Sequence, residues 1–137
     1  MGINKLFVLG AGLMGSGISQ VAATAGFDII LMDTNEKALD KAMSDISLSL
    51  NKFASKGKLT EPSETIMSRI QTTVDISKAA ECDFVIEAVS EIPDLKQKLF
   101  KQLDELLPQQ TIIATNTSAI PITTLAAVTN RGDRVIG

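Results

Sequence analysis

The chain has no histidine, no tryptophan and no tyrosine, and it has a single cysteine in 137 residues. One cysteine excludes an internal disulfide and any metal site built from several cysteines, and we expect no metal. Cys82 is more typical of a small buried hydrophobic side chain at the start of a strand than of a reactive thiol. The missing histidine removes the side chain that enzymes use most often as a general base near neutral pH.

Charge and hydropathy exclude further classes. The net charge is −3, so there is no basic footprint for nucleic acid. No apolar run approaches the ~18 residues that a membrane span needs. A glycine-rich turn interrupts the apolar N-terminus, which therefore lacks the pattern of a signal peptide. The length predicts one domain, residues 1–137, and a cytoplasmic location fits these features.

A glycine-rich turn near the N-terminus organises the chain. Gly10, Gly12 and Gly15 have G-x-G-x-x-G spacing, between an apolar run and a helical pattern. The first permits a tight turn, the second lets backbone approach a pyrophosphate, and the third allows close packing of helix on strand. Free N–H groups at the helix start would face the phosphates. The candidate loop comprises Gly10, Ala11, Gly12, Leu13, Met14 and Gly15. A tight turn without a ligand is the alternative.

Asp33 ends a second apolar run, 18 residues beyond Gly15. A dinucleotide-binding fold places there the carboxylate that binds the ribose hydroxyls. Taken alone, an aspartate at this position is as typical of a turn or a helix cap. With the glycine motif it predicts a dinucleotide site. Because a carboxylate opposes a 2′-phosphate, we expect NAD rather than NADP.

Apolar periodicity and turn residues predict strands that alternate with helices. The expected strands are Ile3–Leu9, Asp28–Met32, Ile70–Val74, Phe84–Ala88, Thr111–Ala114 and Arg134–Ile136. The expected helices are Leu13–Ala25, Thr34 or Asn35 to Ser55, Pro62–Met67, Ile76–Ala80, Pro93–Leu107 and Ile122–Val128. This alternation predicts an α/β, doubly wound parallel sheet of the Rossmann type with strand order 3-2-1-4-5-6. The helical segment between strands two and three exceeds a minimal crossover and is expected to project as an arm.

Helical spacing also predicts which faces are apolar. In the first helix these positions are Leu13, Ile18, Val21, Ala22 and Ala25. In the long second helix they are Ala38, Ala42, Ile46, Leu50 and Phe53, with Thr34 as a candidate N-cap. In the helix that begins at Pro93 they are Leu95, Leu99, Leu103 and Leu106.

The ends of strands four and five carry the remaining candidate residues. Small apolar Ala88 and Val89 follow strand four, where a nicotinamide ring would lie. Glu91 and Lys96 stand nearby, either at the cofactor edge or as an ordinary surface pair.

Asn116 and Ser118 follow strand five, where substrate meets nicotinamide in this fold. They could bind a carboxamide or polarise a carbonyl. Turn chemistry explains them equally well.

Together these residues resemble the NAD-binding domain of L-3-hydroxyacyl-CoA dehydrogenases, closest to the 3-hydroxybutyryl-CoA type. The resemblance covers the whole chain and rests on Gly10-Ala11-Gly12-Leu13-Met14-Gly15-Ser16-Gly17-Ile18, Asp33, Glu87-Ala88, Glu91 with Lys96, Asn116-Thr117-Ser118, and Asp133-Arg134-Val135-Ile136-Gly137. It implies that NAD takes hydride from the 3-hydroxyl carbon of an acyl-CoA in fatty acid or butanoate metabolism.

The same resemblance implies residue roles. Glu91, Lys96 and Asn116 lie along the nicotinamide ribose and ring. Ser118 contacts cofactor and substrate oxygen, so Ser118 and Asn116 are the catalytic candidates. Ser49 and Lys56, on the arm, align with positions that contact CoA.

The sequence departs from the family at its end. The family continues into a segment with the general-base histidine and then into a helical domain that completes the substrate site and forms a homodimer. We therefore expect a shortened chain that binds NAD but is inactive alone. Two alternatives stay open: a stand-alone NAD-binding or sensing module, and a related dehydrogenase acting on a hydroxy acid or a sugar acid.

Overall fold

The structure is a computed structural model, and it describes residues 2–89, 93–115 and 122–137. Its strands are β1 (Lys5–Leu9), β2 (Asp28–Met32), β3 (Ile70–Thr73), β4 (Phe84–Glu87), β5 (Ile112–Thr115) and β6 (Val135–Ile136). Its helices are α1 (Leu13–Thr24), α2 (Glu36–Ser55), α3 (Ser63–Met67), α4 (Pro93–Leu106) and α5 (Ile122–Ala127), with 3₁₀ turns η1 (Ile76–Glu81) and η2 (Gly132–Arg134).

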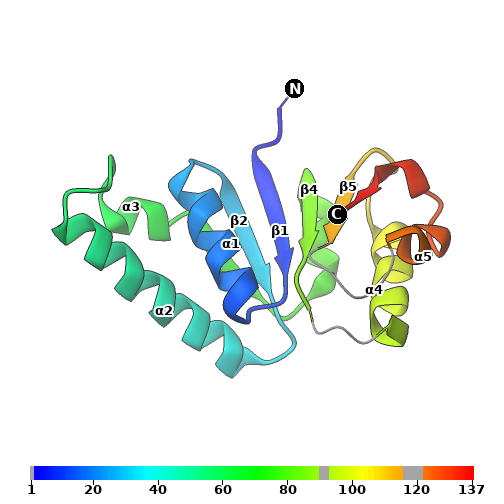
Figure 1. The fold of residues 1–137 in the computed structure, drawn as a ribbon, viewed down its shortest axis with the longest axis horizontal. Coiled ribbons are helices and arrows are strands. Elements are labelled where there is room, and N and C mark those ends of the chain that lie inside the picture. Colours follow the sequence, from blue (N-terminus) through cyan, green and yellow to red (C-terminus); the bar gives the residue numbers. More distant parts are fainter. Residues whose placement is uncertain (1, 90–92, 116–121) are drawn as a thin grey trace.

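The strands form one parallel sheet in the order β3-β2-β1-β4-β5-β6, with helices on both of its faces (Figure 1). This confirms the predicted doubly wound topology. In such a sheet the crevice lies where the strand order reverses, between β1 and β4. Residue Leu6 is paired with Phe84 and Leu9 with Glu87, so the carboxyl ends of β1 and β4 lie level.

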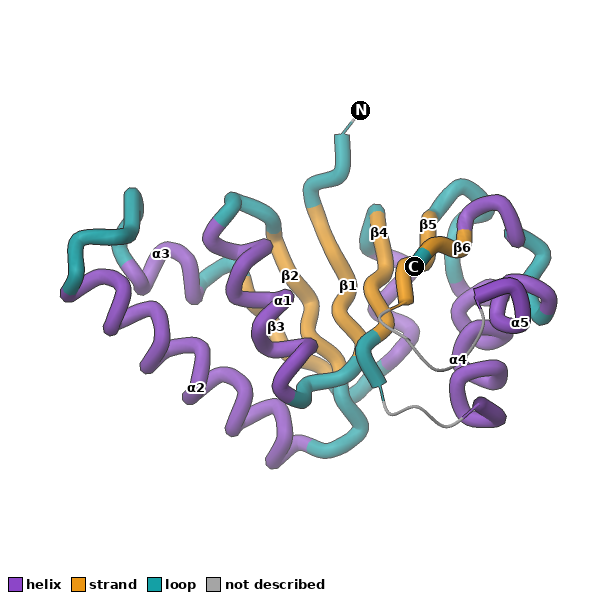
Figure 2. Tube along the Cα trace, viewed as in Figure 1, coloured by secondary structure: helices purple, strands orange, loops and turns teal. Residues whose placement is uncertain are grey.

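Alternation along the strands divides the core into two layers. On β1, Leu6 and Val8 pack with α1, α2 and α3, whereas Phe7 and Leu9 pack with η1, α4 and α5. Figure 2 shows the two groups of helices on either side of the strands. Both layers are apolar, as expected for central strands of a parallel sheet.

Helix α1 is rotated relative to the prediction. It buries Gly15, Ser16, Ser19 and Ala23, while Leu13 is 91% exposed and Val21 is 72% exposed. The reason is steric, because a Cβ on Gly15 would overlap the Gly10 carbonyl oxygen. Only small side chains fit this interface, and the Ser19 hydroxyl donates within the helix, to the Gly15 carbonyl. The predicted apolar face of α1 is therefore right only in part: Ile18 and Ala22 are partly buried against the core, whereas Leu13, Val21 and Ala25 are exposed.

Helix α4 also differs. The leucine pattern predicts a core face through Leu95, Leu99, Leu103 and Leu106. Leu103 is buried as predicted, but the helix also buries Lys96 and Phe100, and Leu107 is buried just beyond its end. In α2 the prediction largely holds, since Ala42, Ile46 and Leu50 are buried and only Phe53 is exposed. Its N-cap is Asn35 rather than Thr34, because the Asn35 side chain accepts hydrogen bonds from Lys37 N and Ala38 N.

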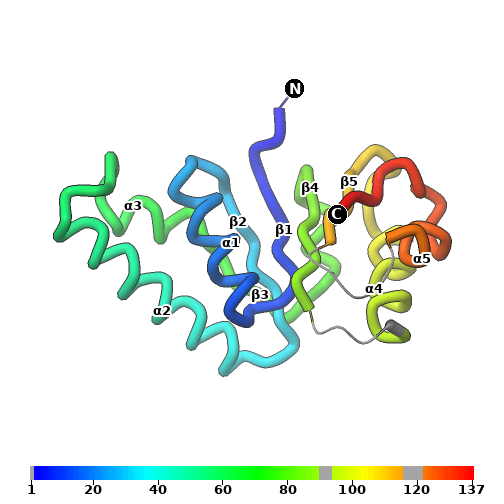
Figure 3. The backbone as a smooth tube through the Cα atoms, viewed as in Figure 1, coloured from blue at the N-terminus to red at the C-terminus, as the bar shows by residue number. Residues whose placement is uncertain are grey.

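The C-terminal end of α2 reaches past the edge of the sheet, with α3 beside it (Figure 3). Residues 51–58 are all exposed there. This is the predicted arm. In the ranges that the structure describes, none of the helices combines the length and the apolar character that crossing a bilayer requires.

Cys82 follows η1 and lies buried in the layer under α4. Burial raises the pKa of its thiol to about 11, because the charged thiolate is disfavoured away from water. The prediction of a small buried hydrophobic side chain is confirmed.

Candidate functional site

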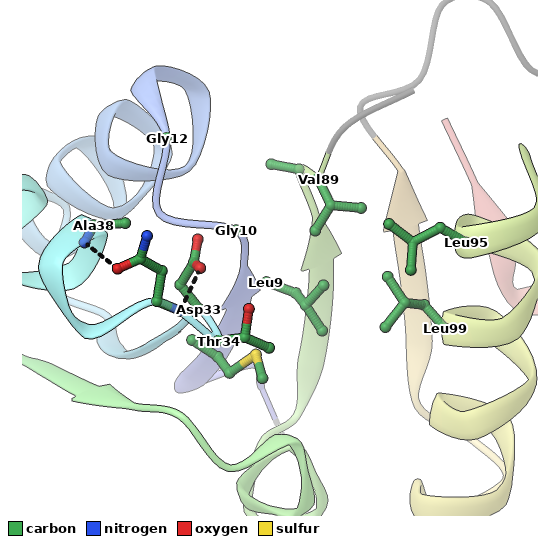
Figure 4. A pocket seen from close by; sticks show the side chains of 12 residues that line it. Leu9, Gly10, Gly12, Asp33, Thr34, Ala38, Val89, Leu95 and Leu99 are labelled. Carbon is green, nitrogen blue, oxygen red and sulfur yellow. Dashed lines mark hydrogen bonds between the residues drawn. The ribbon is translucent and has the colours of Figure 1, made fainter. Parts of the chain in front are cut away.

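A pocket of about 460 Å³ lies at the carboxyl ends of β1, β2 and β4. Its lining consists of Leu9, Gly10, Gly12, Met32, Asp33, Thr34, Asn35, Ala38, Ala88, Val89, Leu95 and Leu99. Figure 4 shows two facing walls, a glycine wall (Gly10, Gly12 and Asp33) and a leucine wall (Val89, Leu95 and Leu99). The pocket stands at the predicted crevice, and it is apolar on one side and polar on the other.

Two glycines of the motif are required by the fold itself. Gly10 has φ +111°, and a Cβ there would come within 2.5 Å of the Ala88 carbonyl oxygen. Gly15 meets the Gly10 carbonyl, as described above. These positions let the β1–α1 turn lie directly against both α1 and the end of β4.

Gly12 is different, because the protein gives no reason for a glycine there. Its φ is −76°, which any residue can adopt, and a Cβ would meet no protein atom within 4 Å. It lines the pocket at the N-cap of α1, whose first turn has no acidic residue and no side-chain cap. Open space beside uncapped N–H groups fits a pyrophosphate. The residues present therefore fit NAD.

Asp33 lies at the mouth of the glycine wall. Its Oδ2 accepts a hydrogen bond from Ala11 N at 2.9 Å, and its Oδ1 accepts one from Asn35 N at 2.9 Å. The carboxylate thus ties the glycine turn to the start of α2. Each oxygen keeps a lone pair for a further donor, so the side chain can also accept from ribose hydroxyls.

Lys96 is not an ordinary surface residue. It is fully buried, and its Nζ lies 3.2 Å from Oε2 of Glu87, which is also fully buried. Glu87 also accepts two hydrogen bonds, from Val89 N at 2.7 Å and from the Thr115 hydroxyl at 2.6 Å. For Lys96, the predicted alternative of an exposed pair is wrong. The family resemblance gives Lys96 a role and includes Glu87 without one; it does not pair the two, because no local spacing links strand β4 to α4.

The other predicted residues fall into three groups. Ala88 and Val89 line the pocket as predicted, whereas Leu13 and Met14 point outward and contribute only their backbone to the helix start. Glu91, Asn116 and Ser118 lie outside the described residues.

The two predicted CoA contacts are on α2. Ser49 is half-buried and accepts a hydrogen bond from Gln20 Nε2 at 2.8 Å. Lys56 is exposed at the C-cap of that helix. They are seven residues apart, two helical turns, and so share one face of the helix. Neither lines the pocket.

Sequence reasoning missed part of the lining: Leu9, Met32, Thr34, Asn35, Ala38, Leu95 and Leu99. The i, i+4 spacing of Leu95 and Leu99 places both on one face of α4, which the prediction assigned to the core. The two differ in burial: Leu95 is 42% exposed, whereas Leu99 is partly buried against the core as predicted. Within the described ranges no three potential metal ligands gather.

Comparison with protein families gives one match over nearly the whole chain. The model of the 3-hydroxyacyl-CoA dehydrogenase NAD-binding domain matches residues 5–137. Among individual proteins, a probable 3-hydroxybutyryl-CoA dehydrogenase of Deinococcus radiodurans is 46% identical over 97% of this chain and 48% of its own length. A probable 3-hydroxybutyryl-CoA dehydrogenase of Bacillus subtilis is 44% identical over 100% of this chain and 48% of its own length.

Solved structures agree. The crystal structure of 3-hydroxybutyryl-CoA dehydrogenase from Escherichia coli K12 has a TM-score of 0.94 and 40% identity, covering 98% of this chain and 29% of that one. That of (S)-3-hydroxybutyryl-CoA dehydrogenase from Ralstonia eutropha has a TM-score of 0.93 and 39% identity, covering 98% of this chain and 48% of that one. The chain spans about half the length of the curated relatives named here.

Proposed function

Since this chain belongs to the family of 3-hydroxyacyl-CoA dehydrogenase NAD-binding domains, we propose that it forms the cofactor half of an enzyme that oxidises L-3-hydroxyacyl-CoA. The observation that carries the proposal is Gly12, a pocket-lining glycine that the fold does not need. Relatives named 3-hydroxybutyryl-CoA dehydrogenases are 40–46% identical to this chain, and a 3-hydroxyadipyl-CoA dehydrogenase is 42% identical, so we propose the 3-hydroxyacyl-CoA class and no particular chain length.

The chemistry divides between cofactor and protein. When bound, NAD accepts the hydride that leaves the 3-carbon as the hydroxyl becomes a ketone. The start of α1 binds the pyrophosphate, and Asp33 accepts hydrogen bonds from the adenine ribose and disfavours a 2′-phosphate. Ala88 and Val89 take the flat nicotinamide ring against the end of β4. From the family resemblance we assign Lys96 and Glu91 to the cofactor side.

The hydroxyl proton needs a base, and this chain has no histidine. We assign Ser118 and Asn116 to hold the substrate oxygen and the cofactor carboxamide. An unassisted serine is a poor base, so the proton acceptor comes from protein outside these 137 residues. That outside part also completes the acyl-CoA site with Ser49 and Lys56 of the arm. It carries the homodimer contact too, and the enzyme works in the cytoplasm.

A second candidate is a cofactor-binding module with no catalytic half. The absence of histidine in these 137 residues is consistent with both candidates. Both proposals include NAD binding. They differ in whether this chain, joined to the second half of a relative, catalyses the reaction.

Two measurements test the proposal. Calorimetry on this chain should show NADH binding tighter than NADPH binding, because Asp33 opposes the extra phosphate. The absorbance of NADH with acetoacetyl-CoA should stay constant with the chain alone, because a general base is worth ~10²–10⁴-fold and substrate positioning is also missing. The chain joined to the second half of a relative should oxidise NADH in the presence of acetoacetyl-CoA, so the absorbance should fall. An inactive joined protein supports the module, and NADPH binding as tight as NADH overturns the cofactor assignment.

A further inference from the structure

We propose that Glu87 is a positioning residue for the nicotinamide side of the site. Its buried carboxylate pairs with the Lys96 ammonium. It also fixes the Ala88–Val89 segment, which contributes Val89 to the leucine wall. The inference rests on the proposed function, in which Lys96 and that segment serve the cofactor. None of the sequence motifs assigns Glu87 a role.

The geometry places Glu87 at a junction of three elements. It is the last residue of β4. It forms an ion pair with Lys96 on α4, and it accepts hydrogen bonds from the Thr115 hydroxyl at the end of β5 and from Val89 N just beyond β4. All three side chains, Glu87, Lys96 and Thr115, are buried. One carboxylate therefore sets the spacing between the carboxyl ends of two strands and the helix that faces the pocket.

Burial alone gives the pair no role in the site, but its position beside the pocket lining does. Burying two charges costs desolvation that close pairing only offsets, and apolar side chains of similar volume often hold a core at least as well. The pair is also next to the lining. Ala88 and Val89 directly follow Glu87 in sequence, while Leu95 precedes Lys96 and Leu99 lies one turn beyond. The charges sit where they control the shape of the leucine wall.

A second buried ion pair on the same helix provides the contrast. Arg131 Nε lies 2.6 Å from Oδ1 of Asp104, near the C-terminal end of α4. The same guanidinium donates to the carbonyl oxygens of Asp104, Leu107, Pro108 and Thr111, so it caps the helix end. None of these residues lines the pocket. This pair stabilises the C-terminal end of α4 and does not contribute to the pocket.

The experiment compares Glu87→Gln with the matched control Asp104→Asn. Each substitution removes one carboxylate charge from a buried pair with one member on α4, while keeping the shape of the side chain. Calorimetry measures NAD and ADP-ribose, which has no nicotinamide, and thermal unfolding is followed by circular dichroism. Glu87→Gln should weaken NAD about tenfold, since it removes the charge-assisted contact that holds Lys96, and it should weaken ADP-ribose by less, since that ligand keeps the ribose but lacks the nicotinamide ring. Asp104→Asn should lower the unfolding temperature without changing the ratio of the two affinities.

Thr115→Val tests the same network if Glu87→Gln does not fold. It removes one hydrogen bond to Glu87 with nearly constant shape, so NAD should again weaken more than ADP-ribose, by a smaller factor. Equal losses of NAD and ADP-ribose, or no loss of either, would overturn the positioning role. Failure of the unsubstituted chain to bind either ligand would instead overturn the proposed function.

Discussion

The two walls of the pocket are each held by a carboxylate at the end of a strand, but in opposite surroundings. Asp33, after β2, is partly exposed and accepts from two backbone N–H groups. Glu87, at the end of β4, is fully buried, pairs with an ammonium, and accepts from a hydroxyl and one backbone N–H. Asp33 orders a loop and stays open to a ligand, whereas Glu87 faces only protein among the described residues.

This difference teaches where specificity can be adjusted. A carboxylate at the pocket mouth acts on the ligand directly, so changing it alters which ligand binds. A carboxylate beneath the wall acts through its neighbours, so changing it alters how well one end of the ligand fits. The two walls should therefore respond separately, with additive effects, because they share no partner.

The largest effect is expected at Gly15, which joins α1 to the glycine wall. Gly15→Ala places a Cβ on the Gly10 carbonyl, and a backbone oxygen cannot rotate away. We expect destabilisation of about 3 kcal/mol or more, because overpacking against a fixed group is at the upper end of its usual range. Thermal unfolding measures it.

Gly17→Ala is the matched control, on the same helix with no atom within 4 Å of the added Cβ. Alanine in a helix interior is better than glycine by about 0.5–1 kcal/mol, so this variant should be slightly more stable. Equal destabilisation by both variants would mean that close packing does not hold the glycine wall.

Gly12→Val should remove NAD binding while leaving the domain folded. The new side chain fills the space that we assign to the pyrophosphate, and the affinity should fall by about a hundredfold or more, since steric clashes cost about 1–3 kcal/mol and sometimes more. Circular dichroism and NAD titration on one sample measure both properties. Unchanged affinity would show that the bound pyrophosphate does not lie against Gly12.

Asp33→Ala should weaken NAD about tenfold and narrow its advantage over NADP, since charge-assisted hydrogen bonds are lost and the repulsion of a 2′-phosphate disappears. ADP-ribose should weaken as much as NAD, the opposite of the pattern expected for Glu87→Gln. Titration of the three ligands against the unsubstituted chain gives the comparison. A loss confined to NAD would show that the two walls are not separate.

The smallest effect is expected at Leu95, the exposed end of the leucine wall. Leu95→Ala should weaken NAD about two- to threefold, because it removes only part of one apolar contact. Stability should barely change. Leu48→Ala, an exposed leucine on α2 outside the pocket lining, is the control and should change neither property. The same calorimetric titration measures both variants, and equal loss from the control would exclude a specific contact.

The sequence was sufficient for the strand order, the glycine motif and Asp33, because these depend on short-range patterns and on topology. It was not sufficient where the buried face of a helix depends on residues that are distant in the sequence. Helix α1 packs its small residues against the sheet because the Gly10 carbonyl leaves no room for larger ones. Helix α4 buries Lys96 because Glu87 at the end of β4 pairs with its charge. Periodicity considers only apolar residues, so it does not predict the burial of a charged residue whose partner is distant in the sequence.

The rate at which Cys82 is alkylated reports how often the native protein opens locally. A thiol with a pKa of about 11 is almost wholly protonated at neutral pH, and its burial shields it from reagents as well. Alkylation must then wait for the layer under α4 to open, so the labelling rate counts openings of native molecules without any denaturant. A ligand that prefers the closed form slows that rate in proportion to its occupancy. A single mass measurement can thus follow cofactor binding through a residue that never touches the cofactor.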